Sequence, residues 1–173
     1  MLVLENIEWE LPDGGQIVRG IDLTVTAGKL TVVTGPNGGG KTSLAKLIAG
    51  LEKPTRGRIL LDGEDITDMG ITERAQRGIA YAFQQPVRFK GLTVRDLLTL
   101  AAGGELQEDK LCGVLGQVGL CTRDYIDREV NSSLSGGEIK RIEIASVLVR
   151  KGRKLAVFDE PEAGIDLWSF TGL

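Results

Sequence analysis

A glycine-rich segment has the residue types that bind phosphate. Residues 35–42 have the sequence GPNGGGKT, which fits the spacing G-x-x-x-x-G-K-[ST]. Glycines let successive backbone N–H groups point inward around phosphate oxygens, and the start of the following helix adds partial positive charge. Lys41 is expected to reach the outer phosphates, and Thr42 is expected to bind Mg²⁺. The segment predicts a nucleotide-phosphate loop in preference to a glycine turn with a chance lysine.

Two adjacent carboxylates, Asp159 and Glu160, follow the apolar residues 155–158. Ligands of open α/β sheets lie at the carboxyl ends of the strands. Beside a phosphate loop, Asp159 is predicted to join the Mg²⁺ shell and Glu160 to polarise the attacking water. Without such a loop, adjacent carboxylates at a strand end are often only solvated loop residues.

A second glycine-containing helix start lies at residues 134–138, LSGGE. Ser135 is placed as an N-cap, and Gly136 and Gly137 can form another backbone cradle for an anion. One ATP needs only one phosphate loop, so this helix start is predicted to serve a nucleotide held by a partner subunit in a head-to-tail pair. An ordinary capped helix is the alternative.

Taken in chain order, these segments resemble the motifs of ABC ATPases. Residues 35–42, Gln84, residues 134–138, 159–160 and 163–166 resemble the Walker A, Q-loop, signature, Walker B and D-loop. The resemblance covers essentially the whole chain and implies an ATP-sandwich homodimer with MgATP. It also implies that Gln84 senses Mg²⁺ and water and couples the site to a partner, whereas a capping or turn amide is its alternative role.

The predicted site therefore has three groups of residues. The catalytic residues are Glu160, Lys41 and Gln84; the nucleotide-binding residues are Gly35, Pro36, Asn37, Gly38, Gly39, Gly40, Lys41, Thr42, Ser43, Ser135, Gly136, Gly137 and Glu138; the metal-binding residues are Thr42, Gln84 and Asp159.

The partner stays open between two classes. Residues 73–79 followed by 82–87 resemble the cytosolic ATPase of the Suf iron–sulfur assembly system, SufC, which implies a soluble scaffold as partner. Asp159-Glu160-Pro161 and a signature that starts with Leu134 equally suit transporter ATPases, which implies a membrane permease docked near residues 84–92.

Two departures from the family pattern bear on activity. The aromatic residue that stacks on adenine would fall near Leu11, and the nearest aromatic, Trp9, is expected to face the core; losing such stacking weakens binding about several-fold. The chain has no histidine and ends at Leu173, before the family's switch histidine, with residues 167–170 resembling the start of one more helix. We therefore expect a truncated domain. A nucleotide-binding but hydrolysis-deficient module is the alternative function, and a non-functional remnant is a third.

The elements that would position these residues follow from hydrophobic patterning. Residues 2–7 and 17–25 predict an antiparallel hairpin, and 30–33, 57–63, 78–83 and 155–158 predict further strands, of which 30–33 and 155–158 are expected to be buried. Helical spacing occurs over 94–120 and 135–150, and a helix is expected to begin near Lys41. The fold class is α/β: one three-layer P-loop domain over 1–173, with an N-terminal antiparallel β region, a helical lobe over 88–145 and its last strands missing.

Composition excludes several other classes. The formal net charge of −3 gives no global positive field for nucleic acid. Apolar runs are far shorter than the roughly 18 residues that span a bilayer, so the protein is expected in the cytoplasm or peripherally at the inner face of the membrane. Cys112 and Cys121 have the spacing of neither a redox pair nor a usual zinc site and are expected to be packing thiols.

Overall fold

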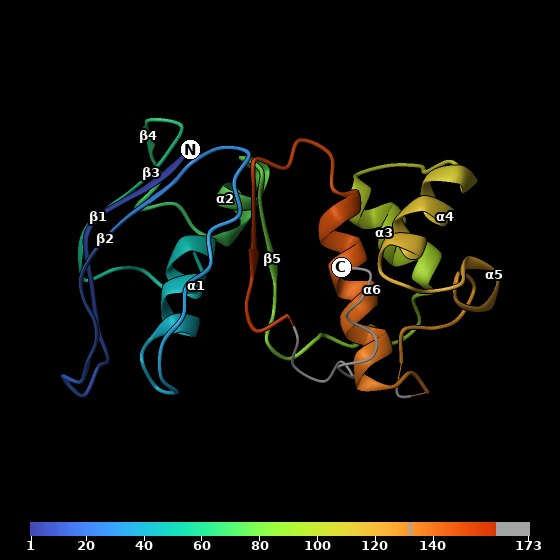
Figure 1. Cartoon of the computed structure of the whole chain (residues 1–173), viewed down its shortest axis with the longest axis horizontal. Helices are drawn as coiled ribbons and strands as arrows, with labels where there is room; N and C mark the ends of the chain where they lie inside the picture. Colours follow the sequence, from blue (N-terminus) through green and yellow to red (C-terminus); the bar gives the residue numbers. More distant parts are fainter. Residues whose placement is uncertain (132, 162–173) are drawn as a thin grey trace. The chain divides into compact units, whose positions relative to one another are not determined.

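The computed structural model describes residues 1–131 and 133–161 and divides into two compact units. The first unit contains residues 1–80 and 153–159, and the second contains residues 81–152 and the described residues from Glu160 onward. Both helices and sheets are present, in agreement with the predicted α/β class (Figure 1). That the chain acts as a single domain stays a prediction.

An antiparallel sheet forms one layer of the first unit. Strands β1 (Leu2–Glu10) and β2 (Gln16–Val25) pair as the predicted hairpin, and both strands are longer than expected. β1 also pairs with β3 (Arg56–Leu61), which continues into the short β4 (Glu64–Asp65) in the order β2-β1-β3-β4. Gly57 is required where β3 crosses a bulge of β1, since a Cβ there would lie 2.3 Å from the Asn6 carbonyl oxygen.

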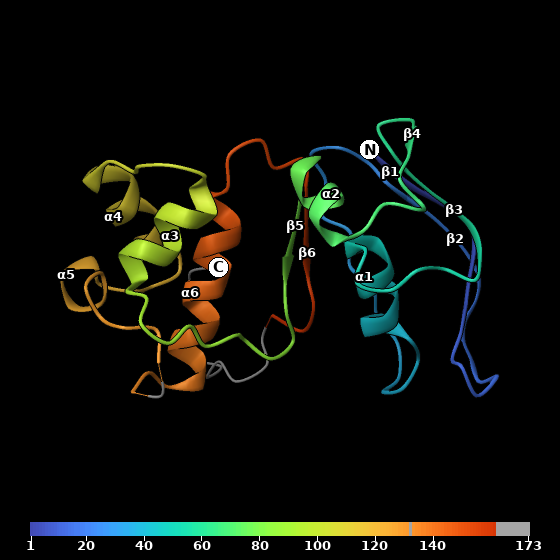
Figure 2. The ribbon, with the colours of Figure 1, turned by 180° about the vertical axis from the view of Figure 1, so that it is seen from behind.

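Helix α1 (Lys41–Ala49) packs beside this sheet, and both Figures 1 and 2 show it against the inner face of the β1–β3 layer. The shorter α2 (Ile71–Gln76) contacts α1. Apolar side chains of α1 close one core with the sheet, and Trp9 packs against this core as predicted. The fully or nearly buried members are Leu2, Leu4, Ile7, Val18, Leu44, Leu47, Ile48, Ile59, Leu61, Ile66 and Ile79.

Strands β5 (Ile79–Ala82) and β6 (Leu155–Phe158) form a second, two-stranded sheet, visible side by side in Figure 2. Both occur where the sequence predicted strands. The four residues of β6 are half-buried, whereas the prediction was a buried strand.

The prediction of a buried strand at residues 30–33 is wrong. Leu30, Val32 and Val33 are 90%, 71% and 49% exposed, and the segment joins neither sheet within residues 1–131 and 133–161. An apolar run of four residues shows only that the side chains are compatible with a sheet. A strand forms when a neighbouring strand is available for backbone hydrogen bonds.

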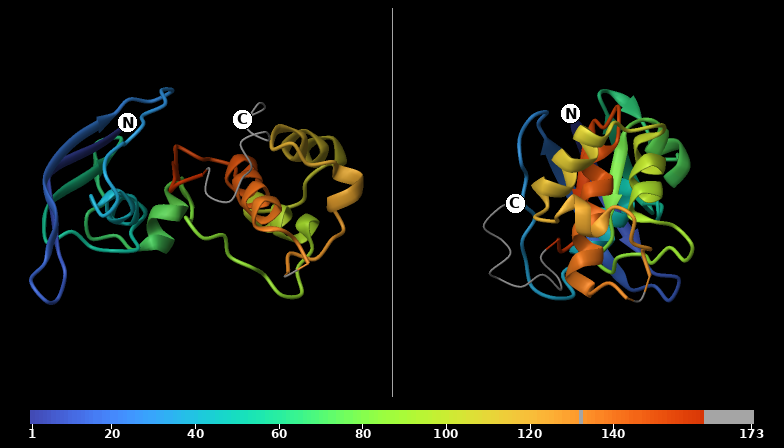
Figure 3. Two further views of the ribbon diagram at one scale, coloured as in Figure 1. Left: turned by 60° about the horizontal axis from the view of Figure 1, so that its bottom comes forward. Right: turned by 90° about the vertical axis from the view of Figure 1, so that its right-hand side faces the viewer.

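The second unit is a group of helices around α6 (Gly136–Val149). Helices α3 (Val94–Ala102) and α4 (Glu108–Gln117) pack on α6, and the one-turn α5 (Thr122–Tyr125) adjoins α4 (Figure 3). The helical pattern over 94–120 is thus two helices, because Gly103 and Gly104 both have positive φ after α3 and end it. The boundaries 88–145 for a helical lobe stay a prediction.

Both cysteines are exposed, so the prediction that they are packing thiols is wrong. On α4 the buried positions belong to Leu111, Val114 and Leu115, which leaves Cys112 on the outer face. Cys121 is the residue just before α5, where the chain turns at the surface.

Ser135 caps α6, as predicted. Its hydroxyl accepts a hydrogen bond from the Glu138 N–H at 3.2 Å, and the Glu138 carboxylate accepts one from the Ser135 N–H at 2.6 Å. Replacing Ser135 by alanine leaves a helix N–H without its partner, so we expect the free energy of unfolding to fall by about 1 kcal/mol. Urea denaturation without nucleotide checks this, with the exposed Ser133→Ala as control; equal midpoints for the two variants would contradict it.

Candidate nucleotide-binding site

The predicted phosphate loop runs along the surface into the N-terminus of α1. Gly38 and Gly40 have φ of 79° and 83°, the left-handed region that glycine adopts without strain. A Cβ on Gly40 would also lie 3.0 Å from the Ile17 carbonyl oxygen, so the loop passes too close to β2 for a side chain there. The glycines are therefore needed for the path of the backbone.

Lys41, the first residue of α1, turns back over this loop. Its ammonium donates to the carbonyl oxygens of Gly35 and Pro36, both at 2.9 Å. An ammonium has three N–H donors, so one more is available for a phosphate oxygen. The helix start and the lysine thus add positive charge at the same loop. Ser43 follows in the first turn of α1 and is half-buried.

Thr42 and Asp159 meet although 117 residues separate them. The Thr42 hydroxyl donates to Asp159 Oδ1 at 3.0 Å, and Asp159 is 5% exposed at the end of β6. Mg²⁺ prefers oxygen ligands and is usually held by one or two protein groups together with substrate phosphates and water. No group of three or more His, Cys, Asp or Glu side chains that could hold a metal lies among the described residues. One hydroxyl and one carboxylate beside a phosphate loop therefore fit a nucleotide-bound Mg²⁺.

In the second unit, Gln84 and Glu160 are hydrogen-bonded side chain to side chain. The Gln84 Nε2 donates to Glu160 Oε2 at 2.7 Å. Glu160 has a φ of 46°, a conformation that a residue with a side chain seldom adopts and that is found at functional sites more than elsewhere. The two residues predicted as catalytic base and sensor are thus direct partners.

The predicted signature residues surround the start of α6. Gly136 is exposed and has no neighbour within 4 Å of a Cβ position, so the helix start is open to an approaching group. The carboxylate of Glu138 points to its own helix cap and accepts a hydrogen bond from the Tyr125 hydroxyl at 2.5 Å. The Tyr125 hydroxyl and then the Ser135 N–H lower the pKa of Glu138, and the same bond to Glu138 raises the pKa of Tyr125. The sequence had no signal for Tyr125.

Comparison with known proteins adds the family. The family model for ABC transporters matches residues 18–163, which include every predicted motif up to the start of the D-loop. The chain belongs to the ABC transporter ATPase family. Its fold class is the α/β P-loop fold, and it carries the kind of ATPase domain whose members hydrolyse ATP.

A curated relative and two solved structures place this ABC ATPase domain among its neighbours. An uncharacterized ABC transporter ATP-binding protein of Methanocaldococcus jannaschii is 44% identical over 163 residues, which are 90% of this chain. The chain spans 65% of the length of that relative. The structure of cbiO1 from Clostridium perfringens, described as part of the ABC transporter complex cbiONQ, is 31% identical with a TM-score of 0.73 over 97% of this chain and 68% of its own. A dimeric ATP-binding cassette bound to ADP and phosphate is 22% identical, with a TM-score of 0.83 over 98% and 78%, and supports the fold.

The remaining predictions for this ABC ATPase domain concern residues outside the phosphate loop and the signature segment. The D-loop at 163–166 and the helix expected from 167–170 fall outside the described residues. Leu11 is exposed in the turn after β1, where an aromatic was expected in the family. Within the described part of the chain, no helix combines the length and apolar character needed to cross a bilayer.

Proposed function

We propose that the chain is the ATP-binding part of an ABC system, which binds MgATP and couples its hydrolysis in a head-to-tail homodimer to a partner protein. The observation that carries the proposal is the contact between Thr42 at the start of α1 and the buried Asp159 at the end of β6. It joins the phosphate loop to a carboxylate at a strand end, which is the arrangement that P-loop ATPases need for MgATP.

The proposal divides the work of binding and hydrolysis among the predicted residues. The backbone N–H groups of 35–42 and the Lys41 ammonium bind and orient the phosphates, and Thr42 and Asp159 hold Mg²⁺, which neutralises phosphate charge. Glu160 accepts a proton from the attacking water while the water oxygen bonds to the terminal phosphorus. The bond between that phosphorus and the bridging oxygen breaks, and ADP leaves. Gln84 orients Glu160 and that water. Ser135, with Gly136 and Gly137, contacts the nucleotide of the partner subunit.

A membrane permease is the partner that we propose first. It is favoured by the transporter description of the family and by cbiO1, which is described as part of a transporter complex. Val87 and Phe89 are exposed apolar residues in the segment after Gln84, and Arg88 and Lys90 beside them are exposed cations. Such a mixed surface suits a protein partner. The proposal places the chain at the cytoplasmic face of the membrane.

A SufC-like assembly ATPase with a soluble scaffold is the second candidate, supported by the resemblance of residues 73–79 and 82–87 to that subfamily. Affinity purification of the full-length protein from cells lysed with and without detergent separates the two. Recovery of integral membrane proteins only with detergent supports the permease, and recovery of a soluble complex without detergent supports the scaffold. A chain that binds MgATP without turnover is the hydrolysis-deficient alternative.

Thr42 provides the test of the Mg²⁺ site. We expect Thr42→Ala to weaken MgATP binding about tenfold or more, because it removes one proposed metal ligand and its hydrogen bond to Asp159. Calorimetric titration of ATP with Mg²⁺ and with EDTA measures this. EDTA should weaken ATP binding by the parent protein. It should change the ATP affinity of Thr42→Ala little, since the contribution of Mg²⁺ to binding is already lost in that variant.

Thr24, exposed on β2, supplies the matched control. Thr24→Ala should behave like the parent protein with both Mg²⁺ and EDTA. Full Mg²⁺ dependence retained in Thr42→Ala would reject the assignment of Thr42 to the metal.

A further inference from the structure

Helix α6 buries a charged pair that the proposed mechanism does not use. Lys140 is 0% exposed, and its ammonium lies 3.2 Å from Glu143 Oε2, where the Glu143 side chain is 13% exposed. Taking two charges out of water is costly, and an apolar pair of the same size would often be as stable. The position of this pair therefore calls for a reason beyond stability.

Both members of the pair bind the backbone of one residue, Phe83. The Glu143 carboxylate accepts a hydrogen bond from the Phe83 N–H at 2.9 Å, and the Lys140 ammonium donates to the Phe83 carbonyl oxygen. The Phe83 ring also packs edge-on against Tyr81, with ring centroids 4.8 Å apart and an angle of 88°. Phe83 is thus held at both of its backbone polar groups and at its side chain.

The residue held in this way directly precedes Gln84. The carbonyl that Lys140 binds belongs to the peptide plane that also contains the Gln84 nitrogen, so fixing this carbonyl fixes the plane from which Gln84 starts. Gln84 itself is exposed, and its side chain has several rotatable bonds, yet its amide lies 2.7 Å from Glu160. A fixed backbone reduces the number of directions in which this amide can point.

We infer that Lys140 and Glu143 are positioning residues for Gln84, which hold the Phe83 peptide so that the Gln84 amide reaches Glu160. This inference rests on the proposed function, in which Gln84 and Glu160 act on the attacking water. The pair lies on α6 (labelled in Figure 1), whose N-cap is Ser135, so one helix carries the signature segment and binds the backbone next to Gln84.

A double-mutant cycle in the full-length protein tests the inference through turnover. Lys140→Met keeps the length of the side chain and removes the ammonium. We expect it to lower kcat about tenfold with little change in KM for MgATP, and to lower kcat less than twofold when Gln84 is already alanine. Lys140→Arg, which keeps donors for the carbonyl, should restore most of the rate. The control is Lys110→Met, which removes an exposed ammonium on α4 and should leave kcat unchanged.

Equal losses of kcat from Lys140→Met in the presence and absence of Gln84 would overturn the inference, since a purely structural pair acts in both backgrounds. So would an unchanged kcat. If Lys140→Met does not fold, Glu143→Met takes its place, because it removes the acceptor of the Phe83 N–H; it should lower kcat when Gln84 is present and much less when Gln84 is alanine.

A second readout does not depend on hydrolysis. The side-chain amide signals of Gln84 in nitrogen–proton NMR spectra are assigned by their disappearance in Gln84→Ala. In the parent protein we expect the hydrogen bond to Glu160 to shift the resonance of one Gln84 amide proton. In Lys140→Met we expect both amide resonances to lie close to those of a free glutamine side chain. Displaced signals that persist in Lys140→Met overturn the inference. A parent protein without ATP turnover would instead reject the proposed function, and the NMR comparison would still decide on the positioning role.

Discussion

Replacing Glu160 by glutamine is expected to lower ATP turnover about 100-fold or more while changing MgATP affinity less than about threefold. The amide has nearly the same size as the carboxylate and keeps an oxygen that can accept the bond from Gln84. It cannot take the proton of the attacking water at neutral pH. The phosphate loop, Lys41 and Thr42 are unchanged, so ground-state binding should persist.

The measurement combines steady-state phosphate release with calorimetric titration of MgATP. Glu105→Gln, an exposed glutamate in the loop before α4, is the matched control and should retain full turnover. Lys41→Ala is the opposite control and should lose binding together with turnover. Turnover of Glu160→Gln within tenfold of the parent protein would show that another group activates the water.

Replacing Arg74 by methionine is expected to destabilise the first unit by about 3–5 kcal/mol. Arg74 is 0% exposed, and its guanidinium donates to four backbone carbonyl oxygens. These belong to Met69 at 2.8 Å, Thr67 at 2.9 Å, and Leu47 and Ile48 at 2.5 and 3.0 Å. Burial lowers the pKa of Arg74. Methionine fills much of the volume but has no donor for these carbonyls, of which, among the described residues, only that of Leu47 also accepts the Gly50 N–H, at 3.3 Å.

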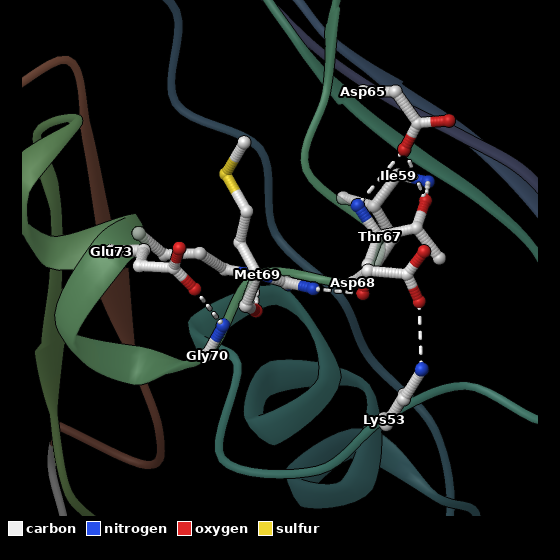
Figure 4. Close-up of polar contacts among 9 residues, drawn as sticks. Lys53, Ile59, Asp65, Thr67, Asp68, Met69, Gly70 and Glu73 are labelled. Carbon is white, nitrogen blue, oxygen red and sulfur yellow. Dashed lines mark hydrogen bonds and ion pairs between the residues drawn. The ribbon is translucent and has the colours of Figure 1, made fainter.

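The carbonyls come from two segments that the arginine joins. Leu47 and Ile48 lie in the last turn of α1, where a cation also complements the helix dipole. Thr67 and Met69 lie in the turn before α2, which has its own polar contacts, shown in Figure 4. In that turn Thr67 donates to Asp65 at 2.6 Å, and the segment is tied to Lys53 through Asp68 at 2.7 Å. The acceptors are held in place, so they cannot turn to water when the arginine is removed.

Denaturant unfolding of the two variants Arg74→Met and Arg77→Met measures the difference. Arg77 follows α2 directly and makes a solvent-exposed ion pair with Glu64 at 2.9 Å, so its removal should change stability far less than the removal of Arg74. A loss of less than 1 kcal/mol for Arg74→Met would mean that water replaces the guanidinium. A loss of similar size for both variants would also reject the role assigned to Arg74.

Features set by neighbours in the chain were determined by the sequence alone. The glycines and Lys41 of the phosphate loop act within eight residues, and the Ser135 cap acts within four, so spacing alone predicted both. The hairpin, the helices around α6 and the strand before Asp159 also followed from local periodicity and turn residues. Such patterns indicate which face of an element is apolar, and the resemblance to the family motifs then predicted which residues bind the nucleotide.

Features that need a partner from elsewhere in the chain were decided by the tertiary structure. Residues 30–33 have the composition of a buried strand, yet they are exposed because no described strand lies alongside them. Arginine and lysine usually lie at the surface, yet Arg74 and Lys140 are buried. Backbone carbonyls distant in sequence accept their hydrogen bonds. Hydrophobic periodicity does not indicate which distant segments will contact a residue. A charged side chain is buried, or an apolar one exposed, according to which groups the fold brings beside it.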